Sequence, residues 1–538
     1  MTTTYHAEVA RHLHRQGAGV IFGLVGDANL FLVDHWVREY GGRYVPAVHE
    51  ASAVMMAAGQ AKVTGDVAVA TVTHGPGLTN TITALVECAK SSLPVVLVAG
   101  RTTDTRDDSP QHVDQRPMIE ATGALFLRAE RAEHAGQDVA TAFTRARAEQ
   151  RPVVLELPVD LAWAQTEPND AVAAVADDVP QAEVDATAVD TALGVVLSAR
   201  RPVILAGRGA IGARDTLLEL ARVLGAPVAT TAQAKDLFVG HPADLGIFGS
   251  LSSAATQDVL ADADCVIAFG ASLTLETTAR GDLVAGKSLV HCDRDAAMIG
   301  RRFTPTAAVV GDADDVAGEF VRLLTEAESE PTGFDRRAVD RLTRPPETTG
   351  GSRRPDTVDL VEFLAHLEEA VPDRTLVVDV GRFALHVLRH AHGSDVRGSM
   401  WAGAGFAAIG LGTPMAIGAA VARPDRPTVL VVGDGGFALG GLNELSTAIA
   451  EGLDLVCIVA NDGSYGAEHI QFTGRGMDPA LSMVTTPDFV ALAEAMGATG
   501  VRVRSTQDFA ALDAAMERRS GPVLVDVRLD PDRVASRG

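Results

Sequence analysis

The feature that most constrains the fold is a repeated unit: a run of aliphatic residues, a glycine turn, and then a helical stretch. The aliphatic runs include residues 19–27, 67–77, 92–100, 201–210, 265–273, 375–383 and 427–436. Continuous Val, Ile and Leu runs with glycine at their ends are typical of parallel strands that are covered on both faces. Helical patterns such as ASAVMMAAGQAKV (51–63) and LNELSTAIAEG (442–452) fill the gaps. The chain is therefore predicted to be an α/β protein with doubly wound parallel sheets.

Two stretches break this rhythm and predict the domain organisation. Residues 164–188 are acidic and rich in Ala and Pro, and residues 326–357 are charged and contain Pro-Pro and Gly-Gly pairs. Both compositions are typical of surface linkers. We therefore predict three α/β domains of similar size, at residues 1–165, 188–326 and 357–538, each with room for its own sheet.

Charge and composition exclude several classes of function. The formal charge of −24 argues against a nucleic-acid partner or an anionic membrane partner. The opening stretch MTTTYHAEVARHLHRQG has no apolar signal core, and no run approaches a membrane span without charge or glycine. The four cysteines are far apart, and none forms a CxxC pair, so buried thiols in a reducing compartment are expected. These features predict a soluble cytoplasmic protein.

The stretch VVGDGGFALGG (431–441) places an acid between glycines at the end of an apolar strand. Open α/β sheets bind ligands at the carboxyl ends of their strands, and glycines there let backbone N–H groups approach an anion. Asp434 would repel a phosphate unless a cation such as Mg²⁺ lay between them. The alternative for a GDG sequence alone is an Asx turn that caps the next helix.

A second polar cluster follows one strand later, in NDGSYG (461–466), and Asn461 lies 28 residues after Gly433. A GDG followed by an Asn/Asp pair at this spacing resembles the signature of thiamine diphosphate enzymes. The resemblance implies that Asp434 is a Mg²⁺ ligand and that Asn461 or Asp462 is the second. Counting from Asp434 favours Asn461. Alignment with the family's Asn-Asn-x-x-aromatic-Gly pattern favours Asp462, with the backbone carbonyl of Ser464 as a further ligand, and both alternatives stay open.

The resemblance extends over essentially the whole chain, in the order pyrimidine-binding domain, central domain and diphosphate-binding domain. The nearest group is that of the acetolactate synthase-like enzymes, with the pyruvate and benzoylformate decarboxylases among its relatives. In GFAAIGLGTPMAIGA (405–419), Ile409 matches the residue that props the cofactor in its bent form, and the Ala407 carbonyl would accept its 4′-amino group. The resemblance also implies cofactor contacts from Gly381, Arg382, Gly433, Gly435, Gly436, Tyr465 and Gly466.

The cofactor also needs an acid beside its aminopyrimidine ring, and Glu50 is the candidate. Glu50 ends one predicted strand and opens a long apolar helix, where an acid could simply stabilise the helix N-terminus. The family pattern HEx₃A…A-x-G-x-A…TG is matched, with Gly59, Ala61 and Gly65 in place. By this resemblance Glu50 promotes the tautomer of the ring that removes the thiazolium proton.

The sequence departs from a synthase at the predicted substrate end. His74 replaces the usual serine of the SGPG turn, and Asp27 stands where pyruvate decarboxylases carry a catalytic acid. Gln111 and His112 lie in a loop where synthases carry Phe-Gln and decarboxylases a His pair. An imidazole near the reacting carbon could transfer protons or bind a carboxylate. The alternatives are a surface role for His112, a structural one for His74, and helix capping by Asp27.

Two further side chains, His469 and Gln471, would either line the substrate channel or face water on a helix. The central domain contains a G-x-G-x-x-G pattern at Gly207, Gly209 and Gly212, which alone is weak evidence for a nucleotide. FAD is therefore a possible ligand of this domain by resemblance, but no flavin is predicted.

We therefore predict a thiamine diphosphate- and Mg²⁺-dependent decarboxylase, C–C lyase or carboligase that acts on a 2-oxo acid or a related 2-ketone. The alternatives are acetolactate synthase-type carboligation of pyruvate, and a non-catalytic nucleotide-binding or partner subunit of the same fold. By resemblance, the protein would be a homodimer or homotetramer, with each active site between the pyrimidine-binding domain of one chain and the diphosphate-binding domain of another.

Overall fold

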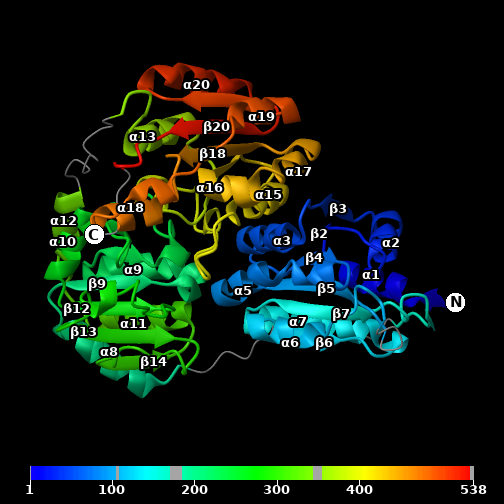
Figure 1. Cartoon of the computed structure of the whole chain (residues 1–538). Helices are drawn as coiled ribbons and strands as arrows, with labels where there is room; N and C mark the ends of the chain where they lie inside the picture. Colours follow the sequence, from blue (N-terminus) through cyan, green and yellow to red (C-terminus); the bar gives the residue numbers. More distant parts are fainter. Residues whose placement is uncertain (1, 104–107, 170–183, 343–353, 534–538) are drawn as a thin grey trace.

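The computed structural model describes residues 2–103, 108–169, 184–342 and 354–533. It contains three domains, each built around a six-stranded sheet whose strands are all parallel (Figure 1). Helices cover the faces of the sheets, as predicted from the continuous aliphatic runs. The predicted domain boundaries themselves stay predictions.

The N-terminal domain has the strand order β3-β2-β4-β5-β7-β6. Its strands are β2 (Val20–Gly23), β3 (Arg43–Pro46), β4 (Ala68–Val72), β5 (Val95–Arg101), β6 (Leu125–Arg128) and β7 (Val153–Pro158). Its main helices are α1 (Tyr5–Arg15), α2 (Leu30–Tyr40), α3 (Glu50–Thr64), α5 (Ile82–Ser91), α6 (Gln115–Thr122) and α7 (Ala135–Glu149). Every residue of β4 and of β7 is buried, which explains why these strands are mostly apolar; the one acid among them, Glu156 of β7, is paired with Arg128.

The central domain has the order β11-β10-β9-β12-β13-β14. Its strands are β9 (Pro202–Ala206), β10 (Val228–Thr230), β11 (Asp244–Ile247), β12 (Cys265–Phe269), β13 (Ser288–Asp293) and β14 (Ala307–Val310). Its helices include α8 (Ala186–Ser198), α9 (Arg214–Leu224), α10 (Ala254–Asp262), α11 (Ala313–Glu326) and α12 (Phe334–Leu342).

The C-terminal domain has the order β16-β15-β17-β18-β20-β19. Its strands are β15 (Thr375–Val378), β16 (Ser399–Trp401), β17 (Thr428–Gly433), β18 (Leu455–Asn461), β19 (Thr499–Val503) and β20 (Val523–Arg528). Its helices include α13 (Leu360–Ala370), α14 (Ala384–His390), α15 (Gly412–Ala422), α16 (Asp434–Gly436), α17 (Leu445–Ala450), α18 (Gly466–Gly474), α19 (Phe489–Met496) and α20 (Phe509–Arg518). All four cysteines of the chain are buried and free, as predicted.

The predicted linkers contain more structure than expected where the structure describes them. Within residues 164–188, a short strand β8 (Gln165–Thr166) pairs with β1 (Thr3–Thr4), and residues 170–183 lie outside the described part. Within 326–357, helix α12 was missed; residues 343–353 lie outside the described part. The physical reason for α12 is that Phe334 and Ala338 on its inner face are buried in the core of the central domain.

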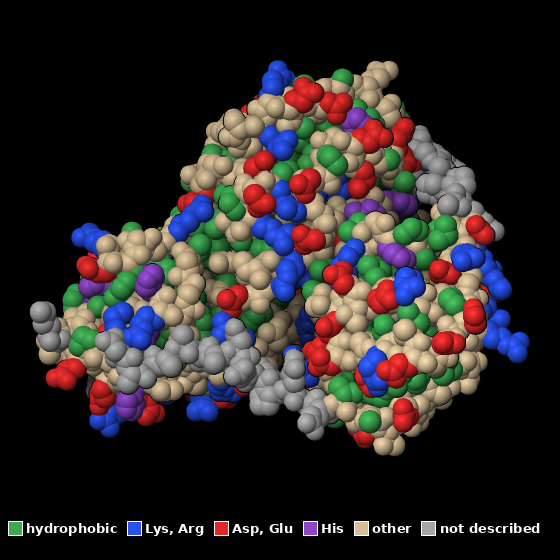
Figure 2. Space-filling model, turned by 180° about the vertical axis from the view of Figure 1, so that it is seen from behind, with side chains coloured by type: hydrophobic (Ala, Val, Ile, Leu, Met, Phe, Trp, Pro, Cys, Tyr) green, Lys and Arg blue, Asp and Glu red, His purple; other side chains and the backbone are tan. Residues whose placement is uncertain are grey.

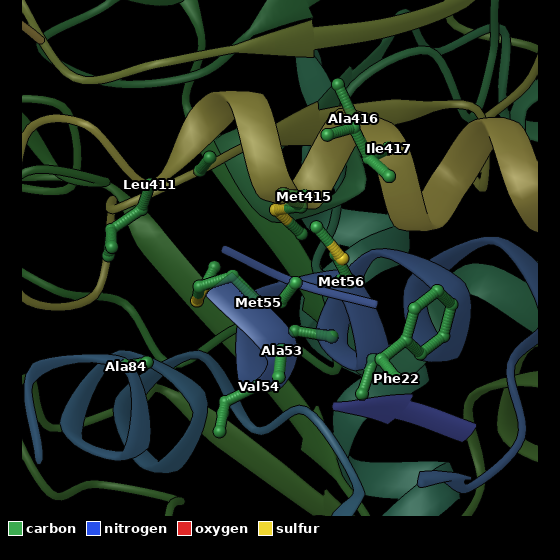
Figure 3. Packing of buried hydrophobic residues seen from close by; sticks show 14 of the residues in the cluster. Phe22, Ala53, Val54, Met55, Met56, Ala84, Leu411, Met415, Ala416 and Ile417 are labelled. Carbon is green, nitrogen blue, oxygen red and sulfur yellow. The ribbon is translucent and has the colours of Figure 1, made fainter. Parts of the chain in front are cut away.

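The N- and C-terminal domains contact each other through α3 and α15, which pack face to face (Figure 3). Met55 and Met56 of α3 lie toward Met415 and Ile417 of α15 in one continuous apolar cluster. The helices approach so closely that a Cβ atom at Gly418 would collide with the backbone of Met56. Neither helix has a polar face, because each is covered all round.

The central domain contacts the C-terminal domain through Asp236, which is buried and forms an ion pair at 2.7 Å with Lys235 of its own domain. Asp236 also accepts hydrogen bonds from the Gly393 amide and the Ser399 hydroxyl of the C-terminal domain. Acidic and basic side chains are mixed over the rear face of the molecule (Figure 2). Among the helices of the described residues, none has the length and apolar character needed to span a membrane.

Candidate active site

The first half of the site lies at the carboxyl edge of the C-terminal sheet, where β17 and β18 end side by side. Gly433 of β17 pairs with Ala460 of β18, so Asp434 and the polar residues after β18 emerge at the same edge. Asp434 is buried, and its carboxylate accepts hydrogen bonds from the amides of Gly435 and Gly463, both at 3.0 Å. The adjacent strand ends thus place the two predicted motifs in contact.

Asn461 and Asp462 point in different directions. The Asn461 side chain donates a 2.8 Å hydrogen bond to Asp526 on β20, and both residues are buried. Asp462 instead lies near Asp434, and it accepts hydrogen bonds from the amide and the hydroxyl of Ser464. Burial raises the pKa of Asp434 to about 7, and the negative charge of Asp462 contributes to the increase. Of the two residues that the sequence left open, Asp462 is therefore the better-placed second metal ligand.

Arg382 lies beside this acid pair. Its Nη2 donates to Asp462 at 2.8 Å and to the Pro531 carbonyl at 2.7 Å, and its buried Nε has no partner among the described residues. A Cβ atom at Gly466 would lie 2.9 Å from this Nε. A guanidinium with a free N–H at a glycine-lined edge is suited to bind a phosphate oxygen. Gly381 precedes it in the turn after β15, against the ring of Phe383.

Asp379, at the end of β15, is a further acid that the sequence reasoning missed. It is fully buried and accepts hydrogen bonds from the amides of Val380 (2.8 Å) and Gly410 (2.9 Å). Burial raises the pKa of Asp379 to about 7. Its sequence signal was available, because Asp379 follows an apolar strand just as Asp434 does. Asp379 anchors the turn that carries Ile409 to the strand beside β17.

That turn, between β16 and α15, contains Ala407 and Ile409. By resemblance, the Ala407 carbonyl would accept the 4′-amino group of the cofactor, and Ile409 would support the cofactor's bent form. Ala407 has a φ of 59°, and its amide donates to the Gly403 carbonyl at 2.7 Å. Ile409 is half-buried and is followed by Gly410, whose Cβ position would lie 3.1 Å from the Gly436 carbonyl. The turn therefore lies directly against the GDGG segment.

Tyr465 and His469 follow the sheet edge that carries Asp434. Tyr465 directly precedes α18, and His469 lies within that helix. The exposed ring of Tyr465 packs on Gly435, where a Cβ atom would lie 2.8 Å from the ring. His469 does not face water, because it is buried between Ser482 (3.2 Å) and Asp532 (3.0 Å). Gln471 is exposed.

The second half of the site lies at the carboxyl edge of the N-terminal sheet. Glu50 opens α3 after β3, is half-buried, and accepts a 2.9 Å hydrogen bond from Asn80. A Cβ atom at Gly77 would lie 3.7 Å from its other carboxylate oxygen. The Glu50 carboxylate is therefore oriented by a side chain of the next loop.

His74 and Asp27 lie close together, on the loops that follow β4 and β2, respectively. His74 is buried, and its Nδ1 lies 3.8 Å from the Asp27 carboxylate, which Thr73 also contacts through a 3.0 Å hydrogen bond. Asp27 is 69% exposed and is not the N-cap residue of α2, which is Asn29. The helix-capping alternative for Asp27 therefore finds no support.

Gln111 and His112 come from the loop after β5. The backbone carbonyl of Gln111 lies against Gly75, whose φ of 60° suits the turn. His112 is exposed, and its Nδ1 lies 2.9 Å from the Thr102 hydroxyl. The five residues predicted to be catalytic thus lie on loops that follow four adjacent strands, at the same edge of one sheet.

Within the described residues, no hydrogen bond or ion pair joins Glu50, His74 or Asp27 to the Asp434–Asp462 pair. The structure describes a single chain, and its two site halves are separate polar edges. That each half faces a second chain stays a prediction.

The G-x-G-x-x-G pattern of the central domain has a packing explanation. Cβ atoms at Gly207 and Gly209 would collide with the backbone of Gly270, at the end of the neighbouring strand β12. Nothing lies within 4 Å of the Cβ position of Gly212. Two of the three glycines are therefore required by contact between two turns, without reference to a nucleotide.

The residues present fit Mg²⁺ and a diphosphate. The carboxylates of Asp434 and Asp462 and the backbone carbonyl of Ser464 would offer the hard oxygen ligands that Mg²⁺ prefers, and a diphosphate would supply further oxygens. Glycines at 433, 435 and 436 and the free Nε of Arg382 line the same edge. The described residues contain no group of three or more His, Cys, Asp or Glu side chains that could hold a metal ion.

Comparison with known proteins gives three family-model matches. Residues 3–121 match the N-terminal TPP binding domain of thiamine pyrophosphate enzymes, residues 189–320 match their central domain, and residues 379–527 match their C-terminal TPP binding domain. Thiamine pyrophosphate and thiamine diphosphate are the same compound.

Similar curated proteins cover nearly the whole chain. The acetolactate synthase large subunit of Parasynechococcus marenigrum (strain WH8102) is 28% identical over 96% of this chain and 86% of its own. The sulfoacetaldehyde acetyltransferase of Castellaniella defragrans is 28% identical over 94% and 90%. The acetolactate synthase isozyme 1 large subunit of Escherichia coli (strain K12) is 27% identical over 97% and 93%.

Proposed function

Because the chain belongs to the thiamine pyrophosphate enzymes, in their acetolactate synthase-like group, we propose that it forms or cleaves a C–C bond beside the carbonyl of a 2-oxo acid or related 2-ketone. One observation carries this proposal: the chain has both the activating acid Glu50 and the paired acids Asp434 and Asp462 at sheet edges. A non-catalytic subunit of this fold would need neither.

The residues of the C-terminal edge bind and orient the cofactor. We assign the metal to Asp434, Asp462 and the Ser464 carbonyl, and the diphosphate to Arg382 and the surrounding glycines. Asn461 keeps a structural role through its hydrogen bond to Asp526. When bound, thiamine diphosphate supplies an acidic carbon that attacks carbonyls and serves as an electron sink.

The residues of the N-terminal edge handle protons. Glu50 shares a proton with the pyrimidine ring, and Asn80 holds its carboxylate in place through the 2.9 Å hydrogen bond. His74 lies next to Asp27 and Thr73, and its imidazole can deliver or accept a proton there. Gln111 and His112 border this group and are assigned to substrate binding.

These proton donors favour decarboxylation or C–C cleavage over condensation. Side chains that deliver a proton would favour release of a protonated product, whereas a site that excludes protons would favour bond formation with a second carbonyl compound. The alternative, acetolactate synthase-type carboligation of pyruvate, is supported by the names of two of the similar proteins. FAD in the central domain is not part of the proposal, and a cytoplasmic location remains a prediction.

The assembly is part of the proposal. We expect a homodimer or a homotetramer in which the edge that carries Glu50 faces the Asp434 edge of another chain. Each site would then be complete only in the oligomer.

The direct test is calorimetry with thiamine diphosphate and Mg²⁺, followed by incubation with pyruvate and a panel of bulkier 2-oxo acids and 2-ketones. Scoring CO₂, aldehyde and acyloin separates cleavage from carboligation. Absence of cofactor binding would contradict the proposal and favour the non-catalytic alternative.

Replacement of Glu50 by Gln is expected to lower turnover on the order of 10²–10⁴-fold, because the general acid–base group is lost. Mg²⁺ and diphosphate binding should persist, since their ligands lie on the other edge. Full turnover in E50Q would disprove the assigned role. The exposed helix acid Glu120, as E120Q, is the matched control.

A further inference from the structure

Two buried glutamates lie at the interface between the N- and C-terminal domains. Each accepts hydrogen bonds from backbone amides of the other domain. Glu444, just before α17, is fully buried and accepts from the Val48 amide at 3.2 Å and from the His49 amide at 3.0 Å. These two residues directly precede Glu50. The Glu444 carboxylate therefore holds the turn from which Glu50 emerges.

Glu87, in α5 of the N-terminal domain, makes the reciprocal contact. It is 1% exposed and accepts from the Gly405 amide at 3.1 Å and from the Phe406 amide at 2.8 Å. These residues directly precede Ala407. The Ser91 hydroxyl donates a further 2.6 Å hydrogen bond to the same carboxylate.

Stability alone is a poor explanation for these two acids. Removing a carboxylate from water is costly, and apolar side chains of similar size often serve a core equally well. Burial raises the pKa of Glu444, which shows that the ionised form is penalised. A carboxylate does offer what no apolar group can, namely two charge-assisted acceptors for consecutive backbone amides.

The surroundings explain why such fixation is needed. Val48 is 47% exposed and Phe406 is 43% exposed, so their side chains do not anchor the turns in a core. The carboxylates supply that anchor from the packed α3–α15 interface next to them. Both turns are therefore fixed through their amides.

We infer that Glu444 and Glu87 are positioning residues of the active site, and that each domain thereby aligns the cofactor-directed turn of the other. Glu444 acts through Glu50, and Glu87 acts through the segment that ends in Ala407 and Ile409. The catalytic part of this inference rests on the proposed function, whereas the reciprocal fixation of the two turns does not.

The first test needs no cofactor. Hydrogen–deuterium exchange of the full chain is measured by mass spectrometry on peptides that cover residues 47–51 and 403–408. E444Q is expected to speed exchange in the first peptide only, and E87Q in the second only. The matched control is D264N, because Asp264 accepts from the consecutive amides of Arg200 and Arg201 in the central domain. Unchanged exchange in both peptides, or equal changes in both for either variant, would overturn the inference.

The second test uses the enzyme loaded with thiamine diphosphate and Mg²⁺. The rate of proton exchange at the thiazolium carbon is followed by NMR after quenching, and cofactor affinity by calorimetry. E444Q is expected to slow that exchange on the order of 10- to 100-fold with little change in affinity, because a misplaced Glu50 is a poor proton acceptor. E87Q is expected to weaken cofactor affinity about tenfold instead.

A double variant separates positioning from mere structural damage. In the E50Q background, E444Q should add no further loss of proton exchange, because it acts through Glu50. An additional loss of similar size would overturn the role of Glu444. If the wild type binds no cofactor, the proposed function fails, and the peptide exchange pattern still decides whether the turns are fixed as inferred. If E444Q does not fold, E87Q carries both tests, since the two contacts are separate.

Discussion

Asp434 and Asp462 form an acid pair at a position where the related pattern has an amide. Burial and the charge of Asp462 raise the pKa of Asp434 from its ordinary value of 3.8 to about 7. The protonated form is thus favoured in the metal-free fold, and its stabilising contribution is lost as the pH rises from about 4 through 7. A metal ion requires the deprotonated carboxylate.

We therefore expect Mg²⁺ affinity to rise with pH up to about 7, and Mg²⁺ to restore thermal stability most strongly above that pH. D462N should shift the midpoint of this dependence to lower pH, because it removes the neighbouring charge. Calorimetry with Mg²⁺ and thiamine diphosphate between about pH 5.5 and 8 measures the midpoint. N461A is the control and should leave it unchanged; a shift in N461A but not in D462N would reverse the ligand assignment.

Ala407 occupies a left-handed backbone conformation, with a φ of 59°. An L-residue with a Cβ atom pays about 1–2 kcal/mol for this conformation, and glycine does not. A407G should therefore raise the free energy of unfolding by up to about 1 kcal/mol after the entropy cost of glycine.

Urea denaturation checks this expectation, with A408G as the matched control, since Ala408 is not among the residues with positive φ. A408G should be neutral or destabilising. Stabilisation by both glycine variants, or by A408G alone, would show that the strain at Ala407 is not the cause.

At the residue level, the sequence predicted Asp434 and Glu50 because each follows an apolar strand and fits a spaced motif. It could not choose between Asn461 and Asp462, because successive residues at a strand end point to opposite sides. The choice depends on Asp526, which lies on the partner strand β20 and binds Asn461. Asp379 also follows an apolar strand, but its role was missed because that role depends on its hydrogen bond to Gly410, 31 residues later in the chain.

At the level of elements, helices α3 and α15 approach each other so closely that only glycine fits at two positions. Cβ atoms at Gly59 and Gly418 would collide with the carbonyls of Met415 and Met56, respectively. Backbone cannot move aside as the end of a flexible side chain can, so the helices would have to separate.

G59A and G418A are each expected to lower the free energy of unfolding by about 3 kcal/mol, through overpacking. G194A is the control, because Gly194 lies on the exposed side of α8 with nothing within 4 Å of its Cβ position. It should stabilise the protein by about 0.5–1 kcal/mol through helix propensity. Chemical denaturation compares the three variants, and stabilisation by G418A would refute the close packing.

The strands were the most predictable elements, because parallel strands covered on both faces need unbroken Val, Ile and Leu runs. Helix α12 was not predicted, because Pro, Gly and charges surround it and only Phe334 and Ala338 mark a buried face. That face becomes visible only once the central domain is built. A composition shift alone therefore could not exclude a packed helix within the predicted linker.

At the scale of the whole molecule, the sheet edges that carry Glu50 and Asp434 lead to a testable prediction about which chains share an active site. When E50Q and D434N chains are co-expressed, a mixed dimer would contain one site with both defects and one intact site. Random pairing should then recover about a quarter of the wild-type activity. This follows only if Glu50 and Asp434 of one site come from different chains.

Each variant expressed alone is the control and should stay inactive. Differently tagged chains allow the mixed species to be purified, and light scattering gives its mass. Inactive mixed dimers of the expected mass would place both residues of a site in the same chain.

The long separation of α3 and α15 along the chain also has a consequence during synthesis. Helix α3 buries ten of its 15 residues, largely against a helix that is translated roughly 350 residues later. At a synthesis rate of about 5–20 residues per second, roughly 20 to 70 s pass between the translation of α3 and that of α15. During that interval the nascent N-terminal domain presents an uncovered methionine- and alanine-rich helix to the ribosome surface and to chaperones. The contact between α3 and α15 can thus form only after most of the chain, up to about residue 422, has been translated.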